Sequence, residues 1–361
     1  MNDVEVKSRN LFVNAAALGA SDIHFHPRAK DTLVRLRLNA KLINVERVPN
    51  RFYEKWISHL KFLAGMDIGE KRKPQNASLD VRILDNFVNL RLSTLPTPYH
   101  ESLVIRLLPQ QQTLSLHELA LFPRSYDKLI SLLFPLEGLV LLTGPTGSGK
   151  TTLLYALLSE LEQKYAPKVI TIEDPVEVKN DNYIQMEVNE KAGLTYAEGL
   201  KAILRHDPDV IMIGEIRHEE TAKIAVRAAM TGHLVLTTMH TTDSWGAVYR
   251  LLEFGIPLSF LQQSLNAVVA QRLVSLLCPF CGPNCHPSCF SRRKRTRLGV
   301  YEILSGHPLK QWVSSLTNGD QSPARPKITS LRDEIKKGVA YGFLAEQVLS
   351  ETKTVDVSWQ G

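Results

Sequence analysis

The sequence predicts an α/β protein of two domains, in which a mixed α+β unit precedes a mostly parallel sheet covered by helices. Three observations lead to this prediction: a length of 361 residues, short apolar strands that alternate with helices in the second part, and a glycine-rich loop between one such strand and the next helix. At roughly 100 to 200 residues per domain, this length favours two domains. Alternating buried strands and helices are typical of a parallel sheet with both faces covered.

The first part of the chain, residues 1–109, has the pattern of a mixed unit with one antiparallel sheet. The spacing of its apolar residues predicts helices over residues 2–18 and 50–64. Alternation of apolar and polar residues predicts strands over residues 33–38, 79–83, 87–94 and 102–108. Polar residues from 110 onward begin a linker that we place at 110–128.

The second part, residues 129–305, has the pattern of a doubly covered sheet. Apolar runs predict strands over residues 139–143, 169–172, 210–213 and 234–238. Helical spacing predicts helices over residues 151–164, 195–205, 219–231 and 243–254. Residues 306–361 form a carboxyl-terminal segment, in which a stretch rich in Gly, Pro and Ser over 318–327 predicts a mobile connection before a last helix from Ser330.

Composition and charge exclude several classes of protein. The hydrophobic fraction of 44% and the charged fraction of 22% are those of a globular chain. The 43 basic and 37 acidic residues give a net charge of +6, too mild to assign a nucleic-acid or membrane partner. The best apolar run, residues 132–143, is interrupted by Pro135 and Glu137, and the first ten residues lack a signal-peptide pattern. We therefore expect a cytoplasmic protein without a membrane span.

The strongest motif is a phosphate-binding loop that follows a predicted strand and opens a predicted helix. It fits the pattern G-x-x-x-x-G-K-[ST] and consists of Gly144, Pro145, Thr146, Gly147, Ser148, Gly149, Lys150, Thr151 and Thr152. Its glycines let backbone N–H groups converge on a polyphosphate, and the helix adds the positive end of its dipole. We expect Lys150 to reach the β and γ phosphates of ATP and Thr151 to give a hydroxyl to Mg²⁺.

Carboxylates and a histidine follow three neighbouring strands of the predicted sheet. Glu173 and Asp174 follow one strand, Glu215 follows another, and His240 follows a third. In a parallel sheet these groups meet at the carboxyl edge, where ligands bind. A carboxylate in such a turn is often only a helix cap, and a lone histidine is more often structural. Beside the phosphate loop, however, they are candidates to hold Mg²⁺, orient water and contact the γ phosphate.

All four cysteines of the chain lie within twelve residues. Cys278, Cys281, Cys285 and Cys289 supply enough thiolates for a structural zinc site, with His286 as a possible substitute ligand. The alternative is a loop of reduced cysteines without metal. The run that follows, residues 291–297, holds five basic residues and is either a solvated loop or a contact for anionic phospholipid or nucleic acid.

A series of motifs in order along the chain is similar to a known family. Residues 20–24 read ASDIH, the phosphate loop follows, then EDPVE at 173–177, LRHDPD at 204–209 with GEIR at 214–217, TGHLVLTTMHT at 231–241 and AQRL at 270–273. Together they resemble the secretion and pilus-assembly ATPases, the motors of type II secretion and type IV pili. A few positions depart from the usual pattern, among them His218, Thr242 and His100, but none removes a group on which the chemistry depends.

The resemblance implies a fold, an assembly and roles for several residues. It implies a homo-hexamer whose subunits have a PAS-like amino-terminal domain and a RecA-like ATPase domain, with nucleotide between the two domains. Arg91 and Arg106 match the family's arginines that reach the phosphates, unless they are solvent-facing strand residues. Glu173 matches the general base and Glu215 the acid near Mg²⁺, although the two roles could be exchanged. A four-cysteine zinc site at this point is usual in members that assemble pili or secrete proteins.

Within the family, a short amino terminus and a cysteine module resemble the competence ATPases of Gram-positive bacteria. The function so implied is a motor that assembles a pilus-like pseudopilus for DNA uptake by driving an integral membrane platform protein, and through it pilin-like subunits, at the inner face of the membrane. A pilus-retraction or type II secretion motor is the alternative within the family, and a RecA-like nucleic-acid translocase is the alternative outside it. We expect no direct binding of nucleic acid, and an anionic membrane surface is a further candidate partner.

Overall fold

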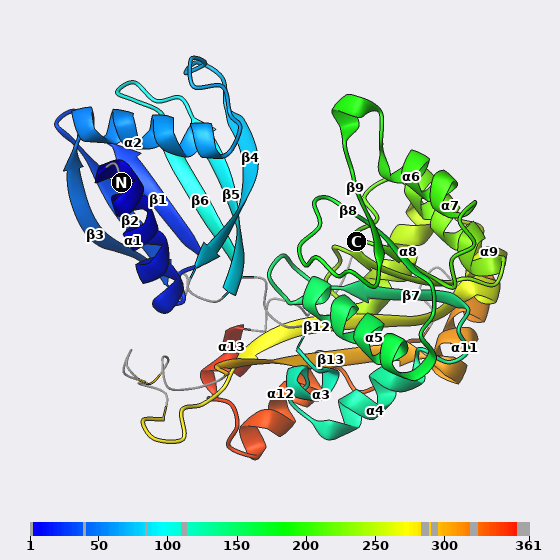
Figure 1. The fold of residues 1–361 in the computed structure, drawn as a ribbon. Coiled ribbons are helices and arrows are strands. Elements are labelled where there is room, and N and C mark those ends of the chain that lie inside the picture. The colour runs from blue at the N-terminus through cyan, green and yellow to red at the C-terminus, as the bar shows by residue number, and fades with distance from the viewer. Residues whose placement is uncertain are drawn as a thin grey trace. The chain divides into compact units, whose positions relative to one another are not determined.

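The structure is a computed structural model that describes residues 3–38, 41–83, 86–109, 114–282, 289, 295–317 and 324–351. The chain divides into two compact units, Met1–Gln112 and Thr113–Gly361. Each unit has a sheet and a hydrophobic core of its own (Figure 1). The fold is therefore of the predicted α/β class.

The first unit is built on a six-stranded antiparallel sheet with the strand order β3-β2-β1-β6-β5-β4. The four strands predicted from the sequence correspond to β2, β4, β5 and β6, and β1 and β3 are additional. The elements of this unit are α1 (Asp3–Ala17), β1 (Asp22–Pro27), β2 (Asp31–Leu38), β3 (Lys41–Pro49), α2 (Asn50–Leu63), β4 (Gln75–Ile83), β5 (Asn86–Leu95) and β6 (Ser102–Pro109).

Helices α1 and α2 cover one face of this sheet (Figure 1). The core beneath them contains Phe25, whose ring stacks on Tyr53 at 5.5 Å and meets Trp56 edge-on at 5.1 Å. Successive residues of a strand point to opposite faces of the sheet. Asp22 and the two residues in register with it, Arg37 and Arg106, therefore lie on the other face. That second face is polar.

The second unit is built on a seven-stranded sheet with the strand order β13-β12-β7-β11-β10-β8-β9. All neighbouring strands are parallel except β12 and β13. Its strands are β7 (Gly138–Thr143), β8 (Val169–Glu173), β9 (Ile184–Glu187), β10 (Val210–Ile213), β11 (Leu234–Met239), β12 (Leu265–Ser275) and β13 (Arg297–Ser305). Its helices are α3 (Leu116–Leu119), α4 (Pro123–Ser131), α5 (Lys150–Tyr165), α6 (Tyr196–Ile203), α7 (Glu219–Met230), α8 (Ser244–Glu253), α9 (Leu258–Ser264), α11 (Gly306–Thr317), α12 (Leu331–Ala340) and α13 (Gln347–Glu351), with a short 3₁₀ turn at Glu190–Ala192.

Helices cover both faces of this sheet (Figure 1). One face packs against α6, α7, α8, α9 and α11, and the other packs against α3, α4 and α5. Every residue of β7, β8, β10 and β11 is buried. This burial is the reason that the four predicted strands are continuous apolar runs.

The structure adds elements that the sequence pattern did not predict. Strands β9, β12 and β13 extend the sheet at its two ends. Strand β12 escapes prediction because it follows α9 without a turn and carries the polar pair Gln271 and Arg272. Helices α3 and α4 begin within residues 110–128, the predicted linker, and Leu116 and Leu129 join the core beside α5.

The carboxyl-terminal helix α12 packs against β12 and β13 through Leu331 and Ile335. It begins at a capping box in which Ser330 and Asp333 satisfy each other's backbone N–H groups. Part of the predicted mobile connection, residues 318–323, lies outside the described residues, and residues 324–329 have no regular structure. Among the helices that the structure describes, none has both the length and the apolar character needed to cross a membrane.

Candidate active site

The phosphate loop connects β7 to α5 and has a backbone that only glycine adopts readily. Gly144 has a φ of 148° and Gly149 a φ of 87°. A Cβ atom on Gly144 would also lie 2.6 Å from the backbone carbonyl oxygen of Gln271, and one on Gly149 would lie 3.0 Å from the side-chain Nε2 of Gln271. The loop thus closes tightly against β12 and leaves its N–H groups at the start of α5 for an anion.

Lys150 is folded over this loop. Its Nζ donates hydrogen bonds to the carbonyl oxygens of Gly144 at 2.7 Å and Pro145 at 3.1 Å. Burial lowers its pKa, and the carboxylate of Glu215 opposes that effect. Ser148 is 4% exposed, and its Oγ has no hydrogen-bond partner among the described residues. A concave loop with a buried ammonium group and an unpartnered hydroxyl fits a polyphosphate. Thr151 and Thr152 follow at the first turn of α5 and are half-buried and exposed, respectively.

Glu173 ends β8 and is only 2% exposed. Tyr155 Oη lies 2.8 Å from both of its carboxylate oxygens, and Thr171 Oγ1 donates to Oε1 at 2.8 Å. Gln185 Nε2 of β9 approaches Oε1 at 3.4 Å. Burial raises the pKa of Glu173, although these donors act in the opposite direction. Glu173 is therefore a buried, positioned carboxyl group with an increased proton affinity.

Glu215 follows β10 and has the opposite acidity. Burial acts to raise its pKa, but the hydrogen bond and charge of Arg217, together with His240 and Lys150, outweigh burial and lower it. Its Oε2 lies 3.3 Å from Nε2 of His240, and its Oε1 accepts a hydrogen bond from Arg217. Glu215 is therefore held as an anion within the electrostatic range of Lys150.

His240 lies on the turn that joins β11 to α8, and its side chain is 48% exposed. This turn is tied to the base of the phosphate loop, because Thr143 Oγ1 lies 2.6 Å from Thr241 Oγ1 and accepts a hydrogen bond from the Thr241 backbone N–H at 3.0 Å. It is tied to the Glu215 loop as well, since Thr238 Oγ1 donates to the Gly214 carbonyl at 2.7 Å. The structure thus brings Lys150, Glu215 and His240 together at the carboxyl edge of the sheet.

Arg91 and Arg106 belong to the first unit, where they face each other across β5 and β6 on the polar face of the sheet. Arg106 Nε donates to Asp22 at 2.9 Å. Burial acts to raise the pKa of Asp22, but the hydrogen bonds from Arg106 and Ser21 lower it. Nε and Nη2 of Arg91 are buried without a hydrogen-bond partner among the described residues. These two nitrogen atoms of Arg91 are therefore shielded from solvent.

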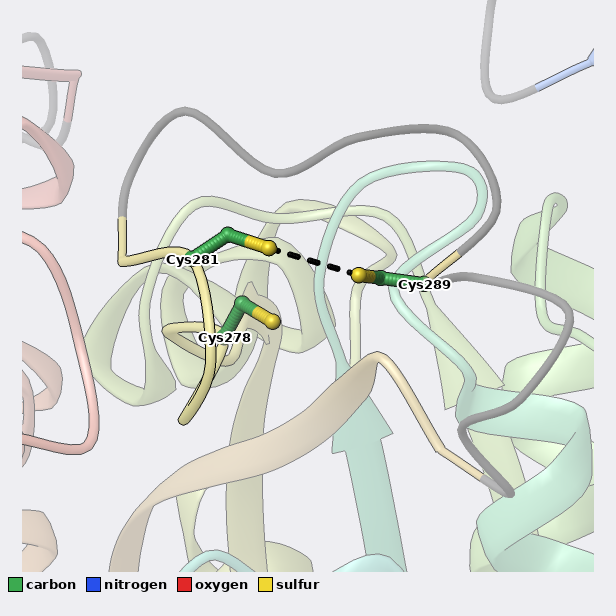
Figure 2. A group of neighbouring side chains, drawn as sticks. All are labelled: Cys278, Cys281 and Cys289. Atoms are coloured by element: carbon green, nitrogen blue, oxygen red, sulfur yellow. Dashed lines mark hydrogen bonds between the residues drawn. The ribbon is translucent and has the colours of Figure 1, made fainter.

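Three of the four cysteines converge at the end of β12 (Figure 2). The Sγ atoms of Cys278, Cys281 and Cys289 all lie within 4.8 Å of one another, and those of Cys281 and Cys289 are 3.4 Å apart. Zn–S bonds of about 2.3 Å in a tetrahedral site separate sulfurs by roughly 3.8 Å, so these thiols fit zinc. Cys285 and His286 lie outside the described residues, as do Arg292, Arg293 and Lys294 of the basic run.

The structure also shows site residues to which sequence reasoning gave no role. Tyr155 and Thr171 hold Glu173, and Gln271 and Arg272 support the phosphate loop. Tyr155 lies five positions after Lys150 on an apolar helix, where the pattern indicates a core residue. Arg272 belongs to the AQRL motif, which indicated the family, but nothing in the sequence around it indicated a chemical role for this residue.

Comparison with known proteins is consistent with this geometry. Residues 2–352 match the family described as Type II/IV secretion system protein. The chain is 48% identical over 345 residues to competence protein ComGA of Bacillus subtilis (strain 168), which covers 95% of this chain and 96% of that protein. It is 38% identical over 366 residues to the type II secretion system ATPase E of Vibrio cholerae, covering 93% of this chain and 72% of that protein.

The fold is also that of a solved ATPase. The X-ray structure of the Legionella pneumophila ATPase DotB superposes with a TM-score of 0.76 over 96% of this chain and 95% of that chain. The sequence identity is 22%, so this likeness concerns the fold.

Proposed function

Because the chain belongs to the Type II/IV secretion system protein family and is an ATPase, we propose that it powers the assembly of a pilus-like competence pseudopilus. Its similarity to ComGA extends over nearly the whole of both chains. The observation that carries the catalytic part of the proposal is the convergence of Lys150, Glu215 and His240 beside the phosphate loop.

Glu173 and Glu215 have different roles in the proposed hydrolysis step. Water attacks the γ phosphorus of ATP, the bond to the β–γ bridging oxygen breaks, and ADP and phosphate leave. Glu173 accepts the proton of the attacking water, because a raised pKa makes its carboxylate the better base. Glu215, held ionised, is the better partner for Mg²⁺, together with the Thr151 hydroxyl. The metal ion, when bound, neutralises charge on the phosphates.

The remaining groups stabilise the charge that develops on the phosphoryl group. Lys150 leaves its two carbonyl acceptors and binds the β and γ phosphates. His240 donates to the γ phosphate from the turn that also contacts Glu215. Arg91 and Arg106 act as cations toward the same phosphates, a role supported by the unpartnered donors of Arg91.

At the level of the machine, we assign this chain to a homo-hexamer that drives an integral membrane platform protein, which in turn adds pilin-like subunits. It would work in the cytoplasm at the inner face of the membrane, where an anionic lipid surface is a further partner. The cysteine module holds a structural Zn²⁺ ion, a role supported by the three converging thiols. No step of ATP hydrolysis depends on that ion.

The test is a matched pair of lysine variants on helix α5. Lys150→Ala should lower steady-state ATP hydrolysis at least about 100-fold, because it removes the cation that contacts the phosphates. Lys164→Ala, an exposed position near the end of the same helix, should leave the rate unchanged. In the bacterium that carries this chain, only Lys150→Ala should abolish transformation by added DNA. Near-normal hydrolysis in Lys150→Ala contradicts the site, and normal transformation without hydrolysis contradicts the competence role.

The effects of added DNA and liposomes on ATP hydrolysis distinguish a pseudopilus motor from a nucleic-acid translocase. A pseudopilus motor should be insensitive to DNA and should hydrolyse ATP faster with liposomes of anionic phospholipid. A rise of about tenfold with DNA, roughly 1.4 kcal/mol of barrier, would instead favour a nucleic-acid translocase.

A further inference from the structure

The AQRL motif lies on β12, the strand that pairs with β7 on the side opposite β11. In this pairing Ala270 is in register with Thr143, the last residue of β7. Gln271 and Arg272 therefore begin where the phosphate loop begins. The loop is packed so closely on this pair that a Cβ atom on Gly144 would lie 2.6 Å from the Gln271 carbonyl oxygen and 3.3 Å from Arg272 Nη1.

Arg272 connects this support to the turn that carries His240. Its Nη1 donates to the Gln271 carbonyl at 2.9 Å, and its Nη2 donates to the Thr242 carbonyl at 2.6 Å. The guanidinium is planar and rigid, so two such hydrogen bonds fix the position of one carbonyl relative to the other. A lysine has a single nitrogen and cannot bridge both carbonyls with the same geometry.

The same turn is held from its other side by Thr143. The Thr143 hydroxyl contacts the carbonyl oxygens of Met239 and Thr241, each at 3.2 Å, and the Thr241 hydroxyl at 2.6 Å. Residues 240–242 are thus clamped between β7 and β12. Because His240 contacts Glu215, the clamp also holds the turn that carries this pair.

The charge of Arg272 is not neutralised by a direct ion pair among the described residues. Burial lowers the pKa of Arg272, and the carboxylates of Glu302 and Asp243 act in the opposite direction. Glu302 is itself engaged, since its Oε1 accepts hydrogen bonds from the Ser244 N–H and hydroxyl at 3.1 and 2.6 Å. The half-buried guanidinium of Arg272 is therefore held by two backbone carbonyls beside the phosphate loop, with no carboxylate in direct contact among the described residues.

We propose that Arg272 is a positioning residue for ATP hydrolysis, which fixes the turn bearing His240 against the phosphate loop. It acts through the Thr242 and Gln271 carbonyls. The inference rests on the ATPase activity of the chain and is independent of which filament it assembles.

The experiment compares Arg272→Ala, Arg272→Lys and Arg250→Ala in the full-length protein, with wild-type hydrolysis measured first. We expect Arg272→Ala to lower kcat at least about tenfold while the Kd of Mg-ADP changes by less than about threefold, because the proposed role of the His240 turn is toward the γ phosphate, which ADP lacks. Arg272→Lys should show an intermediate loss. Arg250→Ala, exposed on α8 and paired with Glu253, should match the wild type.

Two readouts separate positioning from a merely structural role. Guanidinium ion at tens of millimolar should restore part of the turnover of Arg272→Ala, while sodium and ammonium at equal ionic strength should not. In a His240→Ala background the effect of Arg272→Ala on kcat should shrink to about threefold or less. The proposed role of Arg272 is to position His240, and that role is lost when the His240 side chain is absent.

A kcat within about twofold of the wild type in Arg272→Ala overturns the proposal, and so do fully additive effects with His240→Ala. If Arg272→Ala melts at a much lower temperature than the wild type, Arg272→Lys becomes the deciding variant, and a normal kcat for it is then the contradicting result. An inactive wild type would instead contradict the ATPase assignment itself.

Discussion

Glu173 and Glu215 carry the same functional group, but their surroundings give them opposite acidities. Burial dominates at Glu173 and raises its pKa, whereas Arg217, His240 and Lys150 together lower the pKa of Glu215. From the sequence, both glutamates are predicted to follow buried strands, and their roles could be exchanged. The difference in their acidity depends on groups from α5, β9 and the turn after β11. Because these groups are far apart in the sequence, no local sequence pattern predicts that they lie beside the two glutamates.

The first prediction concerns the pH dependence of turnover. Glu173 must be ionised to accept a proton, so kcat should fall as the pH falls through its raised pKa. The hydrogen bonds from Tyr155 stabilise the carboxylate and lower that pKa, so Tyr155→Phe should move the acidic limb of the kcat profile upward by about half a unit to one unit. The measurement is kcat against pH under saturating Mg-ATP.

Tyr165→Phe is the matched control, because Tyr165 ends the same helix and is 47% exposed. Its profile should coincide with that of the wild type. An unmoved acidic limb in Tyr155→Phe would show that Glu173 is not the group titrated. Glu173→Gln should bind ATP without turning it over.

The raised pKa of Glu173 also has a consequence for stability. The folded chain binds this proton more tightly than the unfolded chain does, so the group stabilises the fold at low pH. That contribution is lost as the pH rises from the ordinary glutamate value through the raised value. Above that range, the ionised carboxylate of Glu173 lowers the stability of the fold.

At the scale of elements, sequence patterns predicted the buried strands and missed those at the ends of the sheet. Strands β7, β8, β10 and β11 are buried throughout, and burial on both faces is what makes a strand recognisable as an apolar run. Strand β9 is short and none of its residues is fully buried, and β12 carries polar residues where it supports the phosphate loop. The strands that support the site, β9 and β12, were therefore harder to predict from the sequence than the fully buried strands.

The cysteine module, which includes Cys278, Cys281 and Cys289, gives the prediction at the scale of elements. Purified protein should contain about one zinc ion per chain, and Cys281→Ser should lower both the zinc content and the melting temperature, since metal binding contributes to folding. Phe280→Ala is the control, because Phe280 is 85% exposed, lies next to Cys281 and offers no ligand. A zinc-free wild type, measured by elemental analysis, would refute the site.

At the scale of the whole molecule, the resemblance predicts a ring of six subunits. We expect turnover per chain to rise with protein concentration and to level off where mass measurements reach the hexamer, because the proposed active form is the assembled ring. Full turnover by a monomer would contradict this expectation.

Two sheets with separate cores have a consequence for how such chains diversify. Residues that pack in one unit do not belong to the core of the other, and the boundary falls near residue 112. Homologous exchange at that boundary would bring in a whole unit without leaving unmatched side chains in either core. The chain is thus suited to recombination: a descendant can inherit its ATPase unit from one ancestor and its amino-terminal unit from another, and selection then acts on their cooperation.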